Sequence, residues 1–382
     1  MSSRLSLEQI LRDLVAIDSV SSLSNVEITR YLHQTLESIG CAVTELRYRD
    51  DHGIVKVNLV GILGPSRDVL GAGGLALSVH SDTPPYDPSW RDALILTRRD
   101  GQLFGRGVCS CKGFAAAAIE AAATVDLSSM ERPLALVFTA DGELGGLGAR
   151  RLAENKTVTP ISVIVGEPTG NKPACSHKGY CMFEIDVEGR EVHSSYAHLG
   201  TNAVHRAAEL IQGLQRIGAE LEKETNPAFD PPYSSLNVGV VQAGRAPNLV
   251  PGHCHVVVEC RPTSDALAEQ IGRMIRKEVD TVRERTGGLP IRVNQTRAEP
   301  PVSVPTDTEI VRFFKTKTGH EASSVPFASE LAAWITAGAE GVIFGPGDIR
   351  EVRHDSECVP EKELRRASDL FARAIEHWCF YS

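Results

Sequence analysis

The chain has 382 residues, of which 42% are hydrophobic, and is long enough to form two domains with cores of their own. Its 49 acidic and 40 basic residues give a net charge of −9 without any run of Lys and Arg, so neither a nucleic acid nor an anionic membrane is expected as a partner. The nine cysteines are scattered, and neither a signal segment nor an apolar stretch of ~18–20 residues is evident, which favours a cytoplasmic protein with reduced thiols.

Two helices are expected near the start of the chain. The segment Ser6–Gln9 is a capping-box pattern, and the residues that follow repeat apolar side chains at helical spacing. A second amphipathic segment runs from about Asn25 to Ile39, and Gly40 is its stop signal. Both helices are predicted to serve as scaffold.

Strands are predicted at Lys56–Val60 and Leu75–Val79, and the second ends at His80-Ser81-Asp82. In an open α/β sheet, functional residues gather at the carboxyl ends of strands. A lone His after a strand is more often structural. The motif His80-Ser81-Asp82 nevertheless lies at such a strand end, where functional residues are expected.

A hairpin-like connection leads into the motif Gly105–Gly113 (GRGVCSCKG), and an Ala-rich helix follows it. Two further buried strands are predicted, and they end at Thr139–Glu143 (TADGE) and Gly166–Thr169 (GEPT). Alternating strands and helices predict an α/β fold with a mainly parallel sheet covered by helices.

The pattern changes between His177 and Gly288, where one amphipathic helix and several strands are expected. The chain then returns to a buried strand and a Gly-Pro-Gly turn at Gly345–Gly347. The change of pattern divides the chain into 1–176, 177–288 and 289–382.

These motifs, in this order, resemble the M20 metallopeptidase and amidohydrolase family, most closely its acetylornithine-deacetylase branch. The resemblance covers essentially the whole chain. It implies a hydrolase of linear amides whose substrate is an N-acylated or amide-linked small amino acid. It also implies a catalytic domain formed by 1–176 and 289–382, with a smaller α/β lid domain, 177–288, inserted between them. The homodimer is expected to form through this lid domain.

The resemblance further implies roles for residues of the first domain. His80 would bind zinc and Asp82 would orient its ring, while Glu143 and Glu167 match ligand positions of the family. Asp82 and Glu143 would also take part in catalysis. A further His of the family lies after the Gly-Pro-Gly turn, and His354 is the candidate for it.

Lid residues carry the remaining expectations from the resemblance. The family's counterpart of His193 crosses into the partner's cleft and stabilises the developing oxyanion. Asn248 and Arg261 would lie near the substrate. His193 is therefore predicted to be both catalytic and substrate-binding, and its site is expected to need two chains.

The sequence departs from the family pattern at three positions. Ser110 replaces the Asp that bridges two zinc ions, and a thiol lies on each side of it, Cys109 and Cys111. Gly142 replaces the general base. Removal of a general base typically costs about 10²–10⁴-fold in rate.

The third departure is near the end of the chain. When the Gly-Pro-Gly turn and Glu357 are matched to the family, Arg353 takes the place of the second zinc's His, and His354 lies one residue late. We therefore expect at most one zinc ion per chain, or none, and catalysis other than the standard two-zinc reaction.

Three functions remain open. One zinc ion could be held by His80 and Glu167 with help from Cys109, Cys111 or Glu143. Alternatively, Ser110 or a cysteine could act as a metal-independent nucleophile in acyl transfer, with His80 and Asp82 as base and orienter. The third alternative is an inactive homologue that still binds the small molecule.

Overall fold

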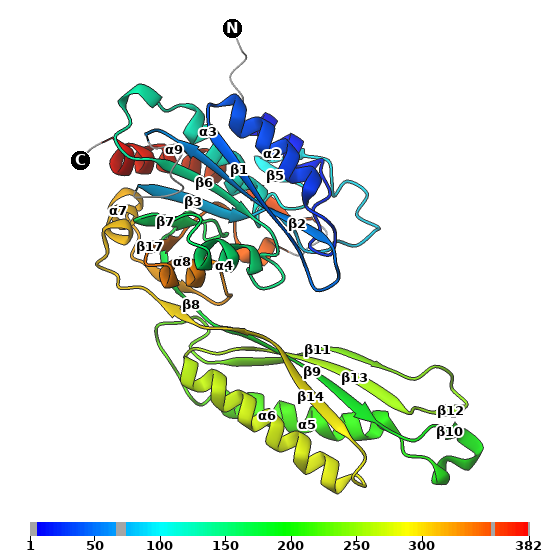
Figure 1. The fold of residues 1–382 in the computed structure, drawn as a ribbon. Coiled ribbons are helices and arrows are strands. Elements are labelled where there is room, and N and C mark those ends of the chain that lie inside the picture. The colour runs from blue at the N-terminus through cyan, green and yellow to red at the C-terminus, as the bar shows by residue number, and fades with distance from the viewer. Residues whose placement is uncertain (1–5, 66–73, 353–355, 381–382) are drawn as a thin grey trace. The chain divides into compact units, whose positions relative to one another are not determined.

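The computed structural model describes residues 6–65, 74–352 and 356–380, and the chain divides into two compact units (Figure 1). The first unit comprises Met1–Cys175, Val304–Ser323 and Ser329–Ser382, and the second comprises Ser176–Ser303 and Ser324–Ala328. The second unit extends beyond the expected end at Gly288 because the strand β14 (Ile291–Glu299) pairs with β9 (Tyr180–Glu188).

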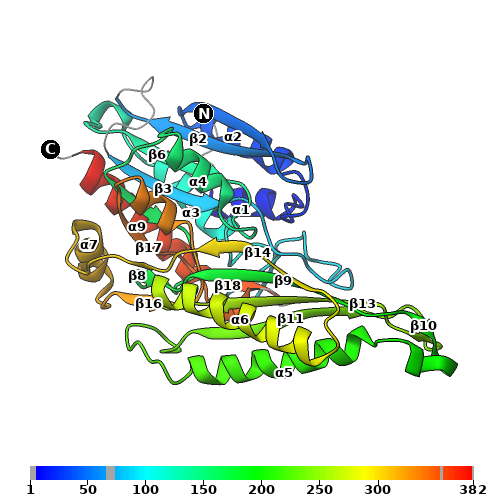
Figure 2. The same ribbon diagram turned by 60° about the horizontal axis from the view of Figure 1, so that its bottom comes forward.

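A large sheet organises the first unit (Figure 2). Its strands, in spatial order, are β1 (Ala42–Arg49), β2 (Val55–Leu63), β6 (Leu134–Thr139), β3 (Leu75–His80), β7 (Ser162–Val165) and β17 (Glu340–Ile343). The order continues with β8 (Ala174–His177) and β15 (Val302–Ser303), and β16 (Ser323–Val325) also pairs with β8; these three strands fall where the chain passes between the units. The central strands β6, β3, β7 and β17 are parallel. β1 and β2 extend this sheet in antiparallel fashion. The predicted α/β class with a mainly parallel sheet is confirmed.

Helices cover the sheet of the first unit. They are α1 (Leu7–Val15), α2 (Val26–Ser38), α3 (Lys112–Ala123), α4 (Leu147–Glu154), α7 (Glu309–Thr318), α8 (Leu331–Thr336) and α9 (Glu361–Cys379). The Ser6 side chain accepts the backbone N–H of Gln9 at 3.3 Å and caps α1 as predicted. The Ala-rich helix α3 is buried almost all round and packs against α9, with the rings of Phe114 and Phe371 4.7 Å apart.

A small antiparallel sheet brings the end of the chain to the Gly-Arg-Gly motif. It contains β4 (Thr97–Arg99), β5 (Gln102–Phe104) and β18 (Cys358–Pro360). Cys358 pairs with Phe104, so Glu357, the residue before Cys358, lies next to Gly105, where the motif starts. The predicted hairpin thus gains a third strand from more than 250 residues away.

The second unit is an antiparallel sheet with two long helices on one face. Its strands, in spatial order, are β11 (Ser235–Ala243), β13 (His253–Arg261), β9 and β14, and its helices are α5 (Ala203–Leu221) and α6 (Asp265–Arg285). A short ribbon joins β10 (Val192–His193) to β12 (Leu249–Val250). Alternate residues of β9, such as Phe183 and Ile185, are buried under the helices, whereas the intervening residues are partly exposed.

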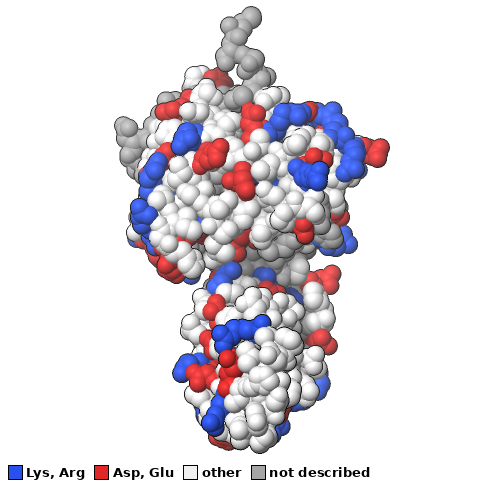
Figure 3. All heavy atoms as spheres, turned by 90° about the vertical axis from the view of Figure 1, so that its right-hand side faces the viewer, with Lys and Arg blue, Asp and Glu red and all other residues white. Residues whose placement is uncertain are grey.

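The surface carries charges of both signs. On the face drawn in Figure 3, acidic and basic side chains appear on each unit among neutral residues. In the part of the chain that the structure describes, no helix is both long enough and apolar enough to cross a membrane.

Candidate functional site

The predicted pair His80 and Asp82 lies buried at the carboxyl end of β3. His80 is 6% exposed and Asp82 is 2% exposed. The Nδ1 atom of His80 is 2.8 Å from the backbone oxygen of Asp82 and 3.5 Å from its Oδ1. We assign the Nδ1–H as the donor to these oxygens, so Nε2 is the ring nitrogen left for a proton or a ligand.

The carboxylate of Asp82 connects three segments of the first unit. Ser21 Oγ donates to it at 2.7 Å, and the backbone N–H groups of Gly142 and Glu143 donate at 2.9 and 3.1 Å. Burial raises the pKa of Asp82, but the hydrogen bond and charge of His80, together with the Ser21 and Gly142 donors, lower it to about 2. Asp82 is therefore a permanent anion that fixes the His80 ring and the loop of Glu143.

Other expected site residues lie within electrostatic reach of His80. Burial lowers the pKa of His80, but its hydrogen bond to Asp82 and the neighbouring Cys111, Asp82 and Glu167 raise it well above its usual value. The structure thus brings Glu167 and Cys111 near the ring. His80 ends β3 and Glu167 follows β7, whereas Cys111 lies directly before α3.

Gly142, which the sequence predicts to lie at the family's general-base position, lies directly against His80. A Cβ atom added to Gly142 would lie 2.3 Å from His80 Cβ, 2.4 Å from Cγ and 2.9 Å from Cδ2. Such contacts are far inside van der Waals distance, so a side chain at residue 142 requires His80 to move, including its Cβ atom. The absence of a side chain at residue 142 therefore goes together with the position of His80, and a side chain restored there would displace His80.

Glu357 shapes the Gly-Arg-Gly motif, a role that the sequence did not suggest. Its buried carboxylate accepts from Arg106 Nη1 at 3.0 Å and from the backbone N–H groups of Gly107, Cys109 and Ser110 at 2.9 to 3.0 Å. Four donors thus converge on one anion. The signal that could have found it is Arg106, because a buried arginine requires a carboxylate partner.

The two thiols of the motif are packed in the interior as hydrogen-bond donors. Cys109 Sγ donates to the backbone oxygen of Asp348 at 3.2 Å, and Cys111 Sγ donates to that of Asp82 at 3.4 Å. Burial raises the pKa of Cys109 well above its usual value and that of Cys111 to about 11. Ser110 Oγ donates to the Cys111 sulfur at 3.7 Å. Neutral, buried thiols disfavour the cysteine-nucleophile hypothesis.

The expected lid residues fall into two separate places in the second unit. His193 pairs with Leu249, and Ser194 donates to the Asn248 backbone oxygen at 2.9 Å, so His193 and Asn248 share the β10–β12 ribbon. Arg261 ends β13, which begins at His253 soon after the ribbon. Eight steps of a strand at ~3.3 Å each put about 26 Å between the ends of β13. Arg261 therefore does not meet His193 and Asn248 within one chain.

Arg261 is held in a fixed orientation. Its guanidinium lies 4.1 Å from the ring centre of Tyr180 and 3.2 Å from Glu259 Oε2. Arg297 lies 4.2 Å from the same ring. The aromatic ring and the carboxylate thus leave Arg261 little freedom of orientation, as is required of a residue that positions a ligand.

Comparison with known proteins identifies the family of this chain. The peptidase dimerisation domain of the M20 family matches residues 175–286. The acetylornithine deacetylase of Myxococcus xanthus is 39% identical over 377 residues, which are 98% of this chain and 97% of that protein. This chain belongs to the M20 family. The acetylornithine deacetylase of Photorhabdus laumondii is 30% identical over 381 residues, which cover 97% of this chain and 97% of that protein.

Solved M20 structures share the fold of this chain. Human carnosine dipeptidase 1 superposes with a TM-score of 0.77 at 17% identity, covering 97% of this chain and 96% of that one. An M20 metallo-carboxypeptidase from Sulfolobus solfataricus gives 0.76 at 16% identity, covering 98% and 99%. The expectation of an M20-type hydrolase is confirmed at the level of the family.

The described residues do not fit the two-metal centre expected of an M20 enzyme. Within 6–65, 74–352 and 356–380, no group of three or more His, Cys, Asp or Glu side chains is arranged to hold a metal ion. Ser110 lacks the charge of a bridging ligand, and its backbone is held by Glu357. Arg353 and His354, the two candidates for the second zinc's ligand position, lie outside the described residues.

Proposed function

We propose that this protein hydrolyses the amide bond of an N-acylated or otherwise amide-linked small amino acid, without the binuclear zinc reaction of its M20 relatives. The observation that carries the proposal is the Asp82–His80 pair, which is intact and tied to the loop of Glu143 in a chain similar over its full length to acetylornithine deacetylases. We further propose that it acts in the cytoplasm and holds at most one zinc ion per chain.

The two residues of the Asp82–His80 pair would have different roles in proton transfer. With Nδ1 directed at Asp82 and its pKa raised by that carboxylate, the His80 ring carries a proton on Nε2 that it can give to the leaving amine. The Asp82 anion stabilises this imidazolium before the proton is transferred. Glu143 is partly exposed beside this pair and is the second carboxylate available for proton transfer.

We propose that the active form is a homodimer joined through the second unit. A site that uses His193, Asn248 and Arg261 together requires two chains, because β13 separates them within one chain. The edge strand β11 also exposes Val240 and Val241, at 39% and 50%. Pairing of this strand with its counterpart would give partners to the unpaired N–H and C=O groups of the edge and place a neighbouring strand beside both side chains.

The proposal is tested by mass spectrometry of free amino acids released from N-acetylornithine and other N-acetyl amino acids, before and after dialysis against a chelator. His80→Ala is expected to lower the rate at least about 10²-fold. The matched control is His320→Ala, because His320 is exposed just after the end of α7, in a segment that contains none of the site residues. Hydrolysis by His80→Ala at the rate of the unmodified protein would refute the role of this pair.

A non-catalytic binding protein is the second candidate, and the contact between Gly142 and His80 favours it. The backbone at Gly142 leaves no room for a carboxylate side chain at the base position. This alternative predicts that calorimetry detects N-acyl amino acids binding to the unmodified protein while no free amino acid is released over many hours.

A further inference from the structure

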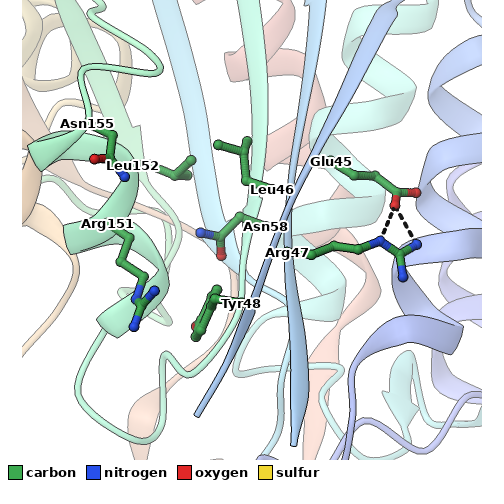
Figure 4. Close-up of a pocket in the computed structure, with 8 residues that line it drawn as sticks. All are labelled: Glu45, Leu46, Arg47, Tyr48, Asn58, Arg151, Leu152 and Asn155. Atoms are coloured by element: carbon green, nitrogen blue, oxygen red, sulfur yellow. Dashed lines mark hydrogen bonds and ion pairs between the residues drawn. The ribbon is translucent and has the colours of Figure 1, made fainter.

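A pocket of about 260 Å³ lies in the first unit between the edge strand β1 and the helix α4 (Figure 4). It is separate from the buried His80. Its lining combines charged, amide, aromatic and aliphatic side chains. The lining residues are Glu45, Leu46, Arg47, Tyr48, Asn58, Arg151, Leu152 and Asn155.

Two residues of the pocket hold the loop 140–148. Tyr48 donates its hydroxyl to Asp141 Oδ2 at 2.7 Å. Asn58 accepts the backbone N–H of Ala140 at 3.0 Å and donates to the Gly148 oxygen at 3.0 Å, so it clamps both ends of the loop. The pocket and the loop therefore share these two side chains.

The other side of the same loop faces the candidate site. The backbone N–H groups of Gly142 and Glu143 donate to Asp82, as described above. Asp141 is also paired at 3.0 Å with Lys56, which is buried. A change in the order of this loop would thus act on the carboxylate that orients His80.

Arg151 gives the pocket an unneutralised positive charge. Its guanidinium lies 4.3 Å from the ring centre of Tyr48, which fixes its orientation. Arg47 is already paired with Glu45 at 2.7 Å and lies on the far side of the pocket in Figure 4. Within the described chain, by contrast, no carboxylate pairs with Arg151.

The remaining side chains define the ligand more closely. Asn155 lies one helical turn after Arg151 and presents an amide on the same side of α4. Leu46 and Leu152 supply apolar contacts. A forked guanidinium binds a carboxylate through two parallel hydrogen bonds, and the leucines suit a short hydrocarbon chain.

We propose that this pocket binds a small carboxylate with a short apolar chain, and that its occupation stabilises the loop 140–148 through Tyr48. The proposal is independent of the chemistry at His80. It assigns the pocket a regulatory role, because Tyr48, which lines the pocket, and Asp82 both hydrogen-bond to this loop.

Binding is tested by calorimetry with butyrate and with butyramide, its uncharged counterpart of the same shape. Butyrate is expected to bind and butyramide at least about tenfold more weakly, since only butyrate forms the charge-assisted pair. Arg151→Gln should lower the affinity for butyrate by about tenfold or more. The matched control Arg150→Gln removes the same charge from the same helix outside the pocket and should keep butyrate affinity within about twofold. If Arg151→Gln does not fold, Arg151→Lys, which retains the charge but loses the fork, should show an intermediate loss.

Coupling to the loop is tested by hydrogen exchange of the peptide that contains residues 140–146. Butyrate should slow its exchange in the unmodified protein. Tyr48→Phe keeps the ring under Arg151 but removes the hydroxyl from Asp141, so butyrate should still bind while the added protection disappears. Equal binding of butyrate and butyramide, or unchanged affinity in Arg151→Gln, would overturn the site. Binding without any protection of the loop would overturn the coupling.

Discussion

Substitution of Gly142 provides the sharpest test of how the site is packed. Gly142 does not have a positive φ, so the cost of a side chain there is steric rather than conformational. A Cβ would meet His80 Cβ at 2.3 Å, and the ring is itself fixed by Asp82. Overpacking of this kind costs about 1–3 kcal/mol. Gly142→Ala is therefore expected to lower the melting temperature by about 2–4 °C for each kcal/mol.

The assay is thermal unfolding of Gly142→Ala, His80→Gly and the double variant. Because His80→Gly removes both the ring and the Cβ atom that makes the closest contact, Gly142→Ala should cost much less in the His80→Gly background, which gives a coupling energy between the two positions. Gly218→Ala is the matched control. Its added Cβ would lie 3.8 Å from Leu236 within the helix α5, so it should be neutral or stabilising.

The same contact predicts that Gly142→Glu alone does not restore a general base. The new side chain would displace the ring that it is meant to assist. If Gly142→Ala melts like the unmodified protein in both backgrounds, or if Gly142→Glu hydrolyses N-acetylornithine efficiently, the packing described for His80 is wrong.

Four further predictions follow from charge, burial and the exposed strand edge. Elemental analysis after dialysis should find fewer than two zinc ions per chain, and two retained ions would contradict the account of Ser110. Glu357→Gln leaves the buried Arg106 without its anion and should cost about 3–5 kcal/mol in urea unfolding, whereas the exposed Glu351→Gln should change little. Burial lowers the pKa of His177 from 6.5 to about 4, so between these pH values the unfolded chain binds a proton at His177 that the folded chain does not. The free energy of unfolding should therefore fall by up to about 3 kcal/mol as the pH drops from 6.5 to 4, and His177→Phe should reduce this dependence on pH. Light scattering should give twice 41.3 kDa for the unmodified protein and a monomer for Val241→Asp, and a monomeric unmodified protein would refute the dimer.

Local patterns predicted the elements well, because periodicity and capping act over a few residues. Ser6 caps α1, and the strand before His80 is buried along its whole length, as expected. The antiparallel edge formed by β1 and the pairing of β14 with β9 were not predicted. Both depend on which strands meet in space, and a single sequence gives no signal for such pairings.

The candidate site was predictable only where its residues are close in sequence. The motif His80-Ser81-Asp82 indicated a ring and its orienting carboxylate, and the structure adds the donors that hold them. The role of Glu357 and the contact between Gly142 and His80 were not predictable, since each joins segments that are distant along the chain. A missing side chain in a motif says nothing about which neighbour fills its space.

The dependence of the Gly-Arg-Gly motif on Glu357 has a consequence for biosynthesis. Glu357 lies 250 residues after Gly107, and at about 5–20 residues per second roughly 12–50 s separate their synthesis. Until then, the N–H groups of Gly107, Cys109 and Ser110 lack the anion that gathers them. The second unit has almost all of its residues between Ser176 and Ser303 and can form its core in this interval. A ribosome-bound chain is therefore expected to acquire protease resistance in the second unit first, with the candidate site ordered only after the closing segment emerges.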